Sequence, residues 1–532
     1  MKSGRANSVL LFVLSVLLFA FCQPGIVFAS GLPFLAWIAY IPFFLLIDYL
    51  SIRTSFLWGA LYGFCAYAAL CWWLFSYGTI ALAFVCFLFA CYFSFVFFLL
   101  CSLRFLLPCF FKKSEWIFRA LVFLSFEYAR THGIFAFSYG IVGYTQWNNS
   151  AFLYFSRFFG VWGITLIILL ANALFAKIIF ERNLKQNLRP LSFLCSLLIA
   201  VHVLPLIASR SPVRGTIHVA LIQDASSADS STLSDFVQDA ELLISLTDSA
   251  LRTHPETDLV VWPETAIVPD ILTHFYQSHD RVRHALSRRV FDFVRSSSAS
   301  FLIGTTHMNS NGDHNCALFF PHKDDENATL RLYSKLHLVP FTEFWPDFLR
   351  GSFFDRIKHN LNCDDFVPGD ELVLFNTKSF QFGVPICFED SFSPLIRNMK
   401  KKGADFFVNI SDDAWAHCVQ AQLIHLSMSA FRSAEYATPT IRSTINGKTC
   451  VIDTYGRVVS SLESDSDGFL CSELLIPADT QTLYFFAGDV LVNAIIAFLL
   501  LLILSGGFVK VIRYGRRKTE KKSNGIWSGN RI

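Results

Sequence analysis

The chain has 532 residues, of which 53% are hydrophobic and 16% are charged, and 58 of them are Phe. This composition excludes an ordinary soluble protein, and the length allows more than one domain. The formal net charge of +3 says little by itself, and nothing in the sequence indicates nucleic-acid binding.

Apolar stretches follow one another through residues 1–212, each near the ~20 residues that a helix needs to cross a bilayer. One more stretch lies near the end of the chain. The expected spans cover residues 8–29, 32–50, 55–76, 79–103, 115–130, 158–180, 191–208 and 488–512. The first stretch could instead be a cleaved signal peptide, because Lys2 and Arg5 precede it and small residues end it. We expect an eight-helix transmembrane bundle, with seven helices in residues 1–212 and the eighth, followed by a basic tail, in residues 481–532.

Basic residues in the short loops indicate the orientation of the spans. They precede the first span and follow the second, fourth, sixth and eighth, so all of them lie on one side of the membrane if there are eight spans. These residues are Lys2, Arg5, Arg53, Arg104, Lys112, Lys113, Arg182, Lys185, Arg189 and the tail from Arg513. The pattern predicts that both termini are cytoplasmic and that residues 213–480 lie on the opposite face.

Residues 213–480 contain no candidate span and alternate short β-rich runs with helical stretches. Strands are expected at 217–223, 258–264, 300–306, 316–320, 331–335, 372–376, 382–387, 405–410, 438–444 and 449–454. Helices are expected near 233–252, 280–297, 391–402 and 419–436. This alternation favours an α/β or layered α-β sandwich. The predicted fold class is therefore an α+β multi-domain membrane protein.

The 14 Cys residues do not form a disulfide framework in the sequence, since most lie in or beside the expected spans. Those in residues 213–480 lack metal-like spacing, although pairing among them stays open. The histidines His307, His314, His322 and His417 also lack the spacing of metal ligands. We expect neither a metal nor a cofactor.

Three residues at expected strand ends are candidates for chemistry: Glu264 in VVWPE, Lys335 after RLYS, and Cys387 at the end of FGVPIC. Taken singly, a Glu or Lys at a strand end is more often a solvated side chain, and a Cys in an apolar run is more often core packing. Together they supply what a cysteine nucleophile needs. A carboxylate can take the thiol proton, and an ammonium can stabilise the thiolate and the oxyanion that follows.

The short motifs around these residues match a known pattern. WPE around Glu264, YxKxHLVPFxE around Lys335 and Glu343, and CFED around Cys387 resemble the Glu-Lys-Cys triad of the nitrilase superfamily. That resemblance implies an αββα sandwich and a thioester acyl-enzyme. Together with the spans, four further segments resemble the apolipoprotein N-acyltransferase family, namely GYTQ (143–146), FFGVWGITLII (158–168), NISDDAW (409–415) and RSTINGKTCVIDTYGRV (442–458).

The resemblance implies a role for each matching residue. Cys387 would be the nucleophile, Glu264 the general base, and Lys335 the group that stabilises thiolate and oxyanion. Glu343 and Glu389 match two further carboxylates that shape the site and assist proton movement. The implied reaction moves a fatty acyl chain from a membrane phospholipid to the α-amino group of the diacylglyceryl-cysteine of an apolipoprotein. The protein would lie in the bacterial inner membrane with residues 213–480 on the periplasmic side.

Two positions depart from the pattern that is common in the family. Phe388 stands where the family commonly has Tyr, so a hydroxyl is missing, while the Phe388 N–H would complete the oxyanion hole. The segment after Gln223 also lacks an aromatic residue that is often found there.

After Glu343 comes an aromatic run. Our hypothesis is that this run forms a loop that enters the membrane surface and gates lipid access. Its residues include Phe344, Trp345, Phe348, Phe353 and Phe354. The alternative is a loop packed on the domain core.

Two other functions stay open at the level of the sequence. A membrane-tethered amidase of the nitrilase type would need no lipid-facing loop, and water would discharge its acyl-enzyme. A polytopic transporter would use the outer domain only to bind ligand. The expected spans carry few ionisable residues of the kind that mark a transport pathway, with Glu127 an exception near a helix end.

Overall fold

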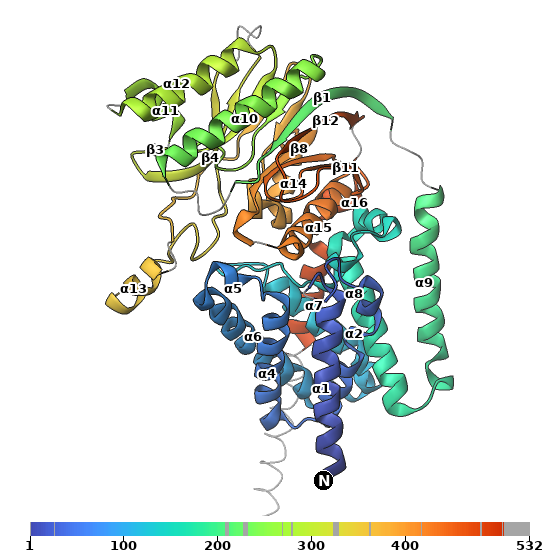
Figure 1. The fold of residues 1–532 in the computed structure, drawn as a ribbon. Coiled ribbons are helices and arrows are strands. Elements are labelled where there is room, and N and C mark those ends of the chain that lie inside the picture. Colours follow the sequence, from blue (N-terminus) through green and yellow to red (C-terminus); the bar gives the residue numbers. More distant parts are fainter. Residues whose placement is uncertain are drawn as a thin grey trace, which may run out of the picture.

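A computed structural model describes residues 2–25, 27–207, 212–226, 232–268, 270–277, 280–322, 329–349, 351–360, 363–416, 418–478, 481–502 and 504. A helical half lies below a half built on two β-sheets (Figure 1). Two parts of the sequence analysis lie outside the described residues, namely His417 and the basic tail that begins at Arg513.

The helical half contains a helix in each of the seven segments predicted for residues 1–212. The helices are α1 (Lys2–Cys22), α2 (Ala36–Ala39), α3 (Ile41–Tyr49), α4 (Ile52–Leu70), α5 (Leu74–Tyr77), α6 (Thr79–Leu106), α7 (Glu115–Ala129), α8 (Ser150–Glu181) and α9 (Leu188–Ile207). Within the described residues, Thr79–Leu106, Ser150–Glu181 and Lys185–Ile207 are long and apolar enough to cross a membrane. Shorter apolar helices cover Ala6–Cys22, Pro33–Tyr49 and Val490–Leu502. The structure therefore supports membrane helices but does not confirm a count of eight.

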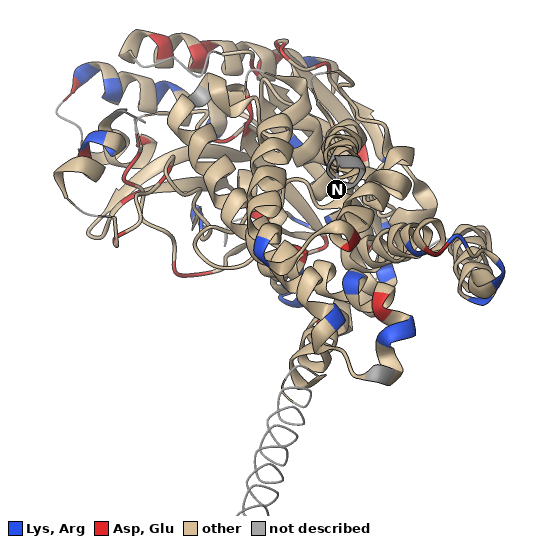
Figure 2. Cartoon of the chain, turned by 90° about the horizontal axis from the view of Figure 1, so that it is seen from below, with Lys and Arg blue, Asp and Glu red and all other residues tan. Residues whose placement is uncertain are grey.

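Charged side chains are sparse along the shafts of these helices. Viewed from below, the ribbon of the helical half is mostly uncharged, with Lys and Arg gathered near helix ends and loops (Figure 2). Glu127, the exception noted in the sequence, pairs with Arg130 at 2.8 Å (Oε2 to Nη2), and both side chains are buried. Arg130 also donates to the carbonyls of Phe137 and Tyr139, so this pair anchors the loop that follows α7.

Helix α8 begins earlier than the span predicted at 158–180, because Asn149 caps it by accepting from the N–H groups of Ala151 and Phe152. Gly160 then interrupts it with a φ of 62° and a ψ of −168°. A Cβ atom there would lie 2.6 Å from the ring of Tyr484 in α16 (Leu483–Ala487). The kink lets the segment before Gly160 run beneath the upper half.

The upper half is a sandwich of two six-stranded sheets. The first sheet has the order β12-β1-β2-β3-β4-β5 and the second β11-β10-β9-β8-β7-β6. The strands of the first sheet are β1 (Val213–Gln223), β2 (Leu259–Val261), β3 (Ser300–Asn309), β4 (Gly312–Phe320), β5 (Arg331–Ser334) and β12 (Gly468–Pro477). Those of the second are β6 (Leu374–Asn376), β7 (Gln381–Gly383), β8 (Phe406–Asp412), β9 (Thr440–Ile445), β10 (Cys450–Ile452) and β11 (Val458–Ser461).

Helices cover the outer face of each sheet. The first sheet is covered by α10 (Leu233–Thr253), α11 (Ile271–Gln277) and α12 (Arg281–Ser296), and the second by α14 (Ser393–Lys401) and α15 (Val419–Tyr436). The predicted αββα arrangement is thus confirmed, and its central strands are buried on both faces, as continuous apolar runs require. Five elements were not predicted from the sequence, namely β11, β12, α11, α16 and the helix α13, which is described below.

Two relations within the sandwich position the site. Strands β1, β2 and β3 are parallel, as are β7, β8 and β9, so within each sheet the chain leaves these strands at the same edge. Helix α15 packs on the second sheet and also against α8 of the helical half. The site therefore lies close to the junction of the two halves.

Candidate active site

Glu264 lies in a turn just after β2. Its neighbour Thr265 has a φ of 48°, and the turn presses on β3 so closely that a Cβ atom on Gly304 would lie 2.1 Å from the Pro263 carbonyl oxygen. The buried Glu264 carboxylate is therefore held firmly. It accepts from Lys335 Nζ at 3.0 Å, from Asn315 Nδ2 at 2.7 Å, and from the Asp412 N–H at 2.8 Å.

Lys335 follows β5, and its side chain is 1% exposed. Its Nζ atom contacts Oε1 of Glu264 at 3.0 Å and Oε1 of Glu343 at 2.6 Å. Burial lowers the pKa of Lys335, but the carboxylates of Glu264 and Glu343 outweigh it and raise this pKa well above its usual range. The ammonium thus stays charged in a buried site, as stabilisation of an anion requires.

Glu343 is oriented by its own loop. Phe341 has a φ of 67°, and the Val339 N–H donates to Glu343 Oε2 at 2.7 Å. Asn315 donates to Glu264 and also, at 3.1 Å, to Glu343 Oε1, so it spans the two carboxylates that hold the lysine. The sequence analysis missed Asn315, although a polar residue just before the apolar run CALFF was a possible signal.

Cys387 does not end a strand, and in this respect the prediction was wrong. Strand β7 stops at Gly383, because Pro385 has no N–H for a strand ladder, and only Ile386 keeps a single bridge to Ile410. Cys387 instead begins the short 3-10 helix Cys387–Ser391 and has a φ of 50°. A left-handed conformation is uncommon for a residue with a side chain and calls for contacts that hold it.

The Cys387 thiol is buried and lies within the electrostatic reach of the other two candidates. Burial raises the pKa of this thiol well above its usual value, and the charge on Glu264 raises it further. Lys335 and a hydrogen bond with Ser411 act in the opposite direction. The resting group is therefore a thiol, which needs a base before it can attack.

Glu389 ties the Cys387 segment to the Lys335 segment. Its carboxylate accepts from the hydroxyl of Tyr333 at 3.0 Å, from the N–H groups of Leu336 (2.7 Å) and His337 (3.1 Å), and from the N–H of Ile386 at 2.8 Å. Burial raises the pKa of Glu389 to about 7 although these N–H groups lower it. The carboxylate thus serves as a brace between two segments that carry candidate residues.

Phe388 is buried beside the nucleophile. Its ring meets that of Phe392 edge-on at 5.1 Å, and Phe392 in turn stacks on His337 at 4.2 Å.

The aromatic run after Glu343 is partly helical. After a turn in which Trp345 Nε1 donates to the Leu349 carbonyl, α13 spans Ser352–Asn360 and projects away from the sandwich, at the level of the upper end of the helical half (Figure 1). Phe348 is 60% exposed and Phe353 is 70% exposed. We name residues 341–354 the aromatic segment.

The aromatic segment also contacts the helical half. The ring of Phe341 lies 4.6 Å from that of Phe84 in α6 and 5.9 Å from that of Phe135, which also meets Phe348 at 6.0 Å. Phe344 is held inside the turn, where its carbonyl accepts from the Phe341 N–H. The segment is thus neither packed wholly on the sandwich core nor free of the membrane half.

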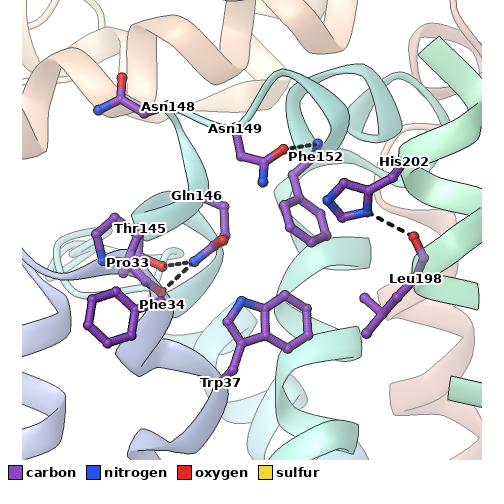
Figure 3. A pocket seen from close by; sticks show the side chains of 10 residues that line it. All are labelled: Pro33, Phe34, Trp37, Thr145, Gln146, Asn148, Asn149, Phe152, Leu198 and His202. Atoms are coloured by element: carbon purple, nitrogen blue, oxygen red, sulfur yellow. Dashed lines mark hydrogen bonds between the residues drawn. The ribbon is translucent and has the colours of Figure 1, made fainter. Parts of the chain in front are cut away.

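A cavity of about 430 Å³ lies elsewhere, between α9 and the rest of the helical half (Figure 3). It is lined by residues that include Trp37, Phe152 and His202, and it contains Gln146 of the GYTQ motif. Gln146 donates to the Pro33 carbonyl at 2.9 Å and to Thr145 Oγ1 at 2.8 Å, so the motif joins parts of the helical half. None of the candidate catalytic residues lines this cavity.

Four buried charged side chains, which we call the charged quartet, lie behind Cys387. His425 contacts Asp390 and Asp413, each at 3.1 Å, and Arg442 contacts the same two carboxylates at 3.0 and 3.5 Å. His425 also lies 3.0 Å from the Cys387 carbonyl oxygen. Asp390, Asp413 and Arg442 stand in motifs quoted from the sequence, but neither they nor His425 were singled out there.

Comparisons with known proteins identify the family of this chain. The carbon-nitrogen hydrolase family profile matches residues 218–481, and the profile of the apolipoprotein N-acyltransferase N-terminal domain matches residues 10–174. Apolipoprotein N-acyltransferase 1 of Treponema denticola is 32% identical, covering 94% of this chain and 97% of that protein. The chain belongs to the apolipoprotein N-acyltransferase family.

Two further members of the apolipoprotein N-acyltransferase family support this assignment. Apolipoprotein N-acyltransferase 1 of Treponema pallidum is 30% identical over 96% of this chain and 98% of its own length. The apolipoprotein N-acyltransferase of Borreliella burgdorferi is 25% identical over 75% of this chain and 76% of its own length. The family predicted from the motifs is confirmed, and membership decides against the amidase and transporter alternatives.

Proposed function

We propose that this acyltransferase takes a fatty acyl chain from a membrane phospholipid and passes it, through a thioester on Cys387, to the α-amino group of the N-terminal diacylglyceryl-cysteine of apolipoproteins. The observation that supports this most is the convergence of Glu264 and Lys335 on a buried thiol. A charged lysine held between two carboxylates, beside a thiol whose pKa is raised, is an arrangement suited to base-assisted acyl transfer.

In the first half-reaction, Glu264 accepts the thiol proton while Cys387 Sγ attacks the carbonyl carbon of the phospholipid ester. The carbonyl π electrons move onto oxygen. When the carbonyl re-forms, the bond between the acyl carbon and the glycerol oxygen breaks. The leaving alkoxide takes the proton from Glu264 and departs as a lysophospholipid.

In the second half-reaction, the neutral α-amino nitrogen of the acceptor attacks the thioester carbon, and Glu264 takes one proton from that nitrogen. The C–S bond breaks as the new amide forms. The Cys387 thiolate then recovers the proton from Glu264, so the enzyme returns to its starting state. A thioester suits this order because it is activated toward amines.

The negative oxygen formed in each half-reaction needs donors. Lys335 Nζ and the Phe388 N–H are the groups that we assign to it, and Glu343 keeps the lysine charged and in place. Glu389 has a bracing role, because its contacts join the segments that carry Lys335 and Cys387.

The membrane arrangement is part of the same proposal. Residues 1–212 and 481–532 supply eight spans, and residues 213–480 form the catalytic domain on the periplasmic side of the inner membrane. The short basic loops and the apolar helices support this topology. Phe344, Trp345 and Phe348 belong to the aromatic segment, which gates lipid entry at the outer surface, and the exposure of Phe348 and its contact with Phe135 support that role.

The proposed chemistry can be tested by trapping the intermediate. The full chain in lipid nanodiscs is incubated with a phospholipid labelled in its acyl chain, and the adduct is located by mass spectrometry. We expect a labelled thioester on Cys387 that disappears when a diacylglyceryl-cysteine peptide is added and that is absent in Cys387→Ser. Cys471→Ser, which removes another free thiol remote from the site, is the matched control. A folded protein that acylates peptide without a Cys387 adduct would disprove the mechanism.

A further inference from the structure

The peptide bond between Cys387 and Phe388 is held from one side. The Cys387 carbonyl oxygen accepts from Asn409 Nδ2 at 3.2 Å and lies 3.0 Å from His425 Nε2. In a planar trans peptide the C=O and the next N–H point in opposite directions. The contacts that fix this carbonyl therefore also fix the direction of the Phe388 N–H, which points away from His425.

The protonation of His425 follows from its neighbours. Nε2 faces the Cys387 carbonyl and Oδ1 of Asp390, and Nδ1 faces Oδ1 of Asp413. The partners of Nε2 are oxygens that accept hydrogen bonds, so Nε2 carries a proton. Nδ1 lies 3.1 Å from Asp413 Oδ1 and 3.4 Å from Nη2 of Arg442, so its nearer partner is also an acceptor. Burial and the charge of Arg442 lower the pKa of His425, but Asp390 and Asp413 outweigh them and raise this pKa to about 9.

The quartet is balanced in charge. Asp390 and Asp413 supply two carboxylates, and His425 and Arg442 supply two cations, with all four side chains no more than 3% exposed. A buried cluster of this kind is costly to desolvate and stabilises a protein no better than apolar packing of similar volume. Stability alone therefore does not account for it, whereas its contact with the nucleophile's carbonyl suggests a role in the site.

We propose that His425 is a positioning residue, which directs the Cys387–Phe388 peptide so that the Phe388 N–H faces the developing oxyanion. The inference rests on the proposed thioester chemistry at Cys387. A charged donor on the Cys387 carbonyl polarises the peptide and makes its N–H a stronger donor. Asn409 is the second, neutral donor to the same carbonyl.

This role differs from that of a general base. Nε2, the ring nitrogen that faces Cys387, carries a proton, so it has no lone pair free to accept one from the thiol. Its ring also contacts the backbone of Cys387 rather than accepting from the sulfur. Thiol activation is left to Glu264, and His425 acts only through the peptide that it orients.

The test separates reactivity of the thiol from stabilisation of the oxyanion. Wild type, His425→Leu, His425→Gln and Asn409→Ala are prepared as full chains in nanodiscs. For each variant we measure the rate of Cys387 alkylation by iodoacetamide and the rate of Cys387 acylation by labelled phospholipid. Alkylation passes through no oxyanion, so it reports the thiol alone.

We expect His425→Leu to lower acylation about 100-fold, as loss of an oxyanion donor does, with alkylation changed by less than about threefold. His425→Gln retains an N–H donor, so its acylation rate should be at least about tenfold higher than that of His425→Leu. Asn409→Ala should lower acylation about tenfold at unchanged alkylation. Glu435→Gln is the control, because it removes a buried charge from the same helix without contacting Cys387, and its ratio of the two rates should equal that of wild type.

The outcomes are distinct. Acylation at the wild-type rate in His425→Leu, or an equal loss of both rates, overturns the inference while leaving the proposed function intact. If His425→Leu does not fold, Asn409→Ala and His425→Gln decide the matter by the same ratio. If wild type itself forms no Cys387 thioester, the proposed function fails and the inference fails with it.

Discussion

Lys335 and Glu343 form a buried ion pair with 2.6 Å between Nζ and Oε1, and the same ammonium lies 3.0 Å from Glu264. When both carboxylates are ionised, the three groups carry a net negative charge. That charge disfavours a thiolate at Cys387 and keeps the nucleophile protonated at rest. Moving the thiol proton to Glu264 transfers one negative charge from the carboxylate to the sulfur, where Lys335 stabilises it.

Glu264→Gln should move two rates in opposite directions. The charge of Glu264 raises the pKa of Cys387, so its removal lowers that pKa and should speed alkylation by iodoacetamide near pH 8. Acyl transfer should fall about 10²–10⁴-fold because the general base is lost. Both rates are measured on one preparation in nanodiscs. Transfer at the wild-type rate in Glu264→Gln would show that Glu264 is not the base.

Phe348→Ser should impair the use of bilayer lipid but not the chemistry. Phe348 is 60% exposed and contacts Phe135. If its ring is buried in the membrane surface, losing the ring costs about 1.5–3 kcal/mol. We expect acylation by nanodisc phospholipid to fall about tenfold or more, with a water-soluble short-chain ester used as before. Tyr276→Ser, which removes an exposed aromatic ring on α11, is the control. Equal use of both donors by Phe348→Ser would exclude the gate.

His425 should make stability depend on pH in a defined direction. Its pKa is raised from the ordinary value of 6.5 to about 9, so the folded state binds the proton more tightly than the unfolded chain. The stabilisation is complete below about pH 6.5 and is lost as the pH rises through about 9. The difference in thermal midpoint between wild type and His425→Gln should therefore be larger at pH 6 than at pH 9.5. A difference that grows with pH would show that the folded protein holds a neutral His425.

Gly160→Ala should destabilise the junction of the two halves. The Gly160 backbone lies in a region that is almost restricted to glycine, and an added Cβ would meet the Tyr484 ring at 2.6 Å. We expect a loss of about 2–4 kcal/mol, measured as a lower thermal midpoint in detergent. Gly133→Ala also changes a glycine of positive φ but meets nothing within 4 Å, so it controls for the backbone alone. Equal effects of the two changes would mean that contact with Tyr484 is unimportant.

The sequence predicted most of the sandwich and its candidate residues because these signals are local. Short motifs with a characteristic spacing contain Glu264, Lys335 and Cys387. The buried strands are continuous apolar runs in the sequence. The aromatic character of the segment after Glu343 hid the helix α13, and Pro385 ended the strand before Cys387 sooner than its apolar sequence suggested.

The charged quartet could not be predicted in the same way. Asp390, Asp413, His425 and Arg442 lie on four different elements, and each side chain alone looks like an ordinary surface group. Arg442 on β9 contacts both carboxylates, and α15 adds His425 by packing onto the second sheet. Asn315 was missed for a similar reason, since its two carboxylate partners come from turns distant in sequence.

Helix α15 has a consequence for how the enzyme can be divided. Every residue from Ile424 to Tyr436 is buried, because the helix touches the second sheet on one side and α8 on the other. A helix buried all round has no face prepared for water. Cutting the chain between its membrane and catalytic parts would thus uncover the helix that carries His425, so the folded site depends on remaining attached to its membrane anchor.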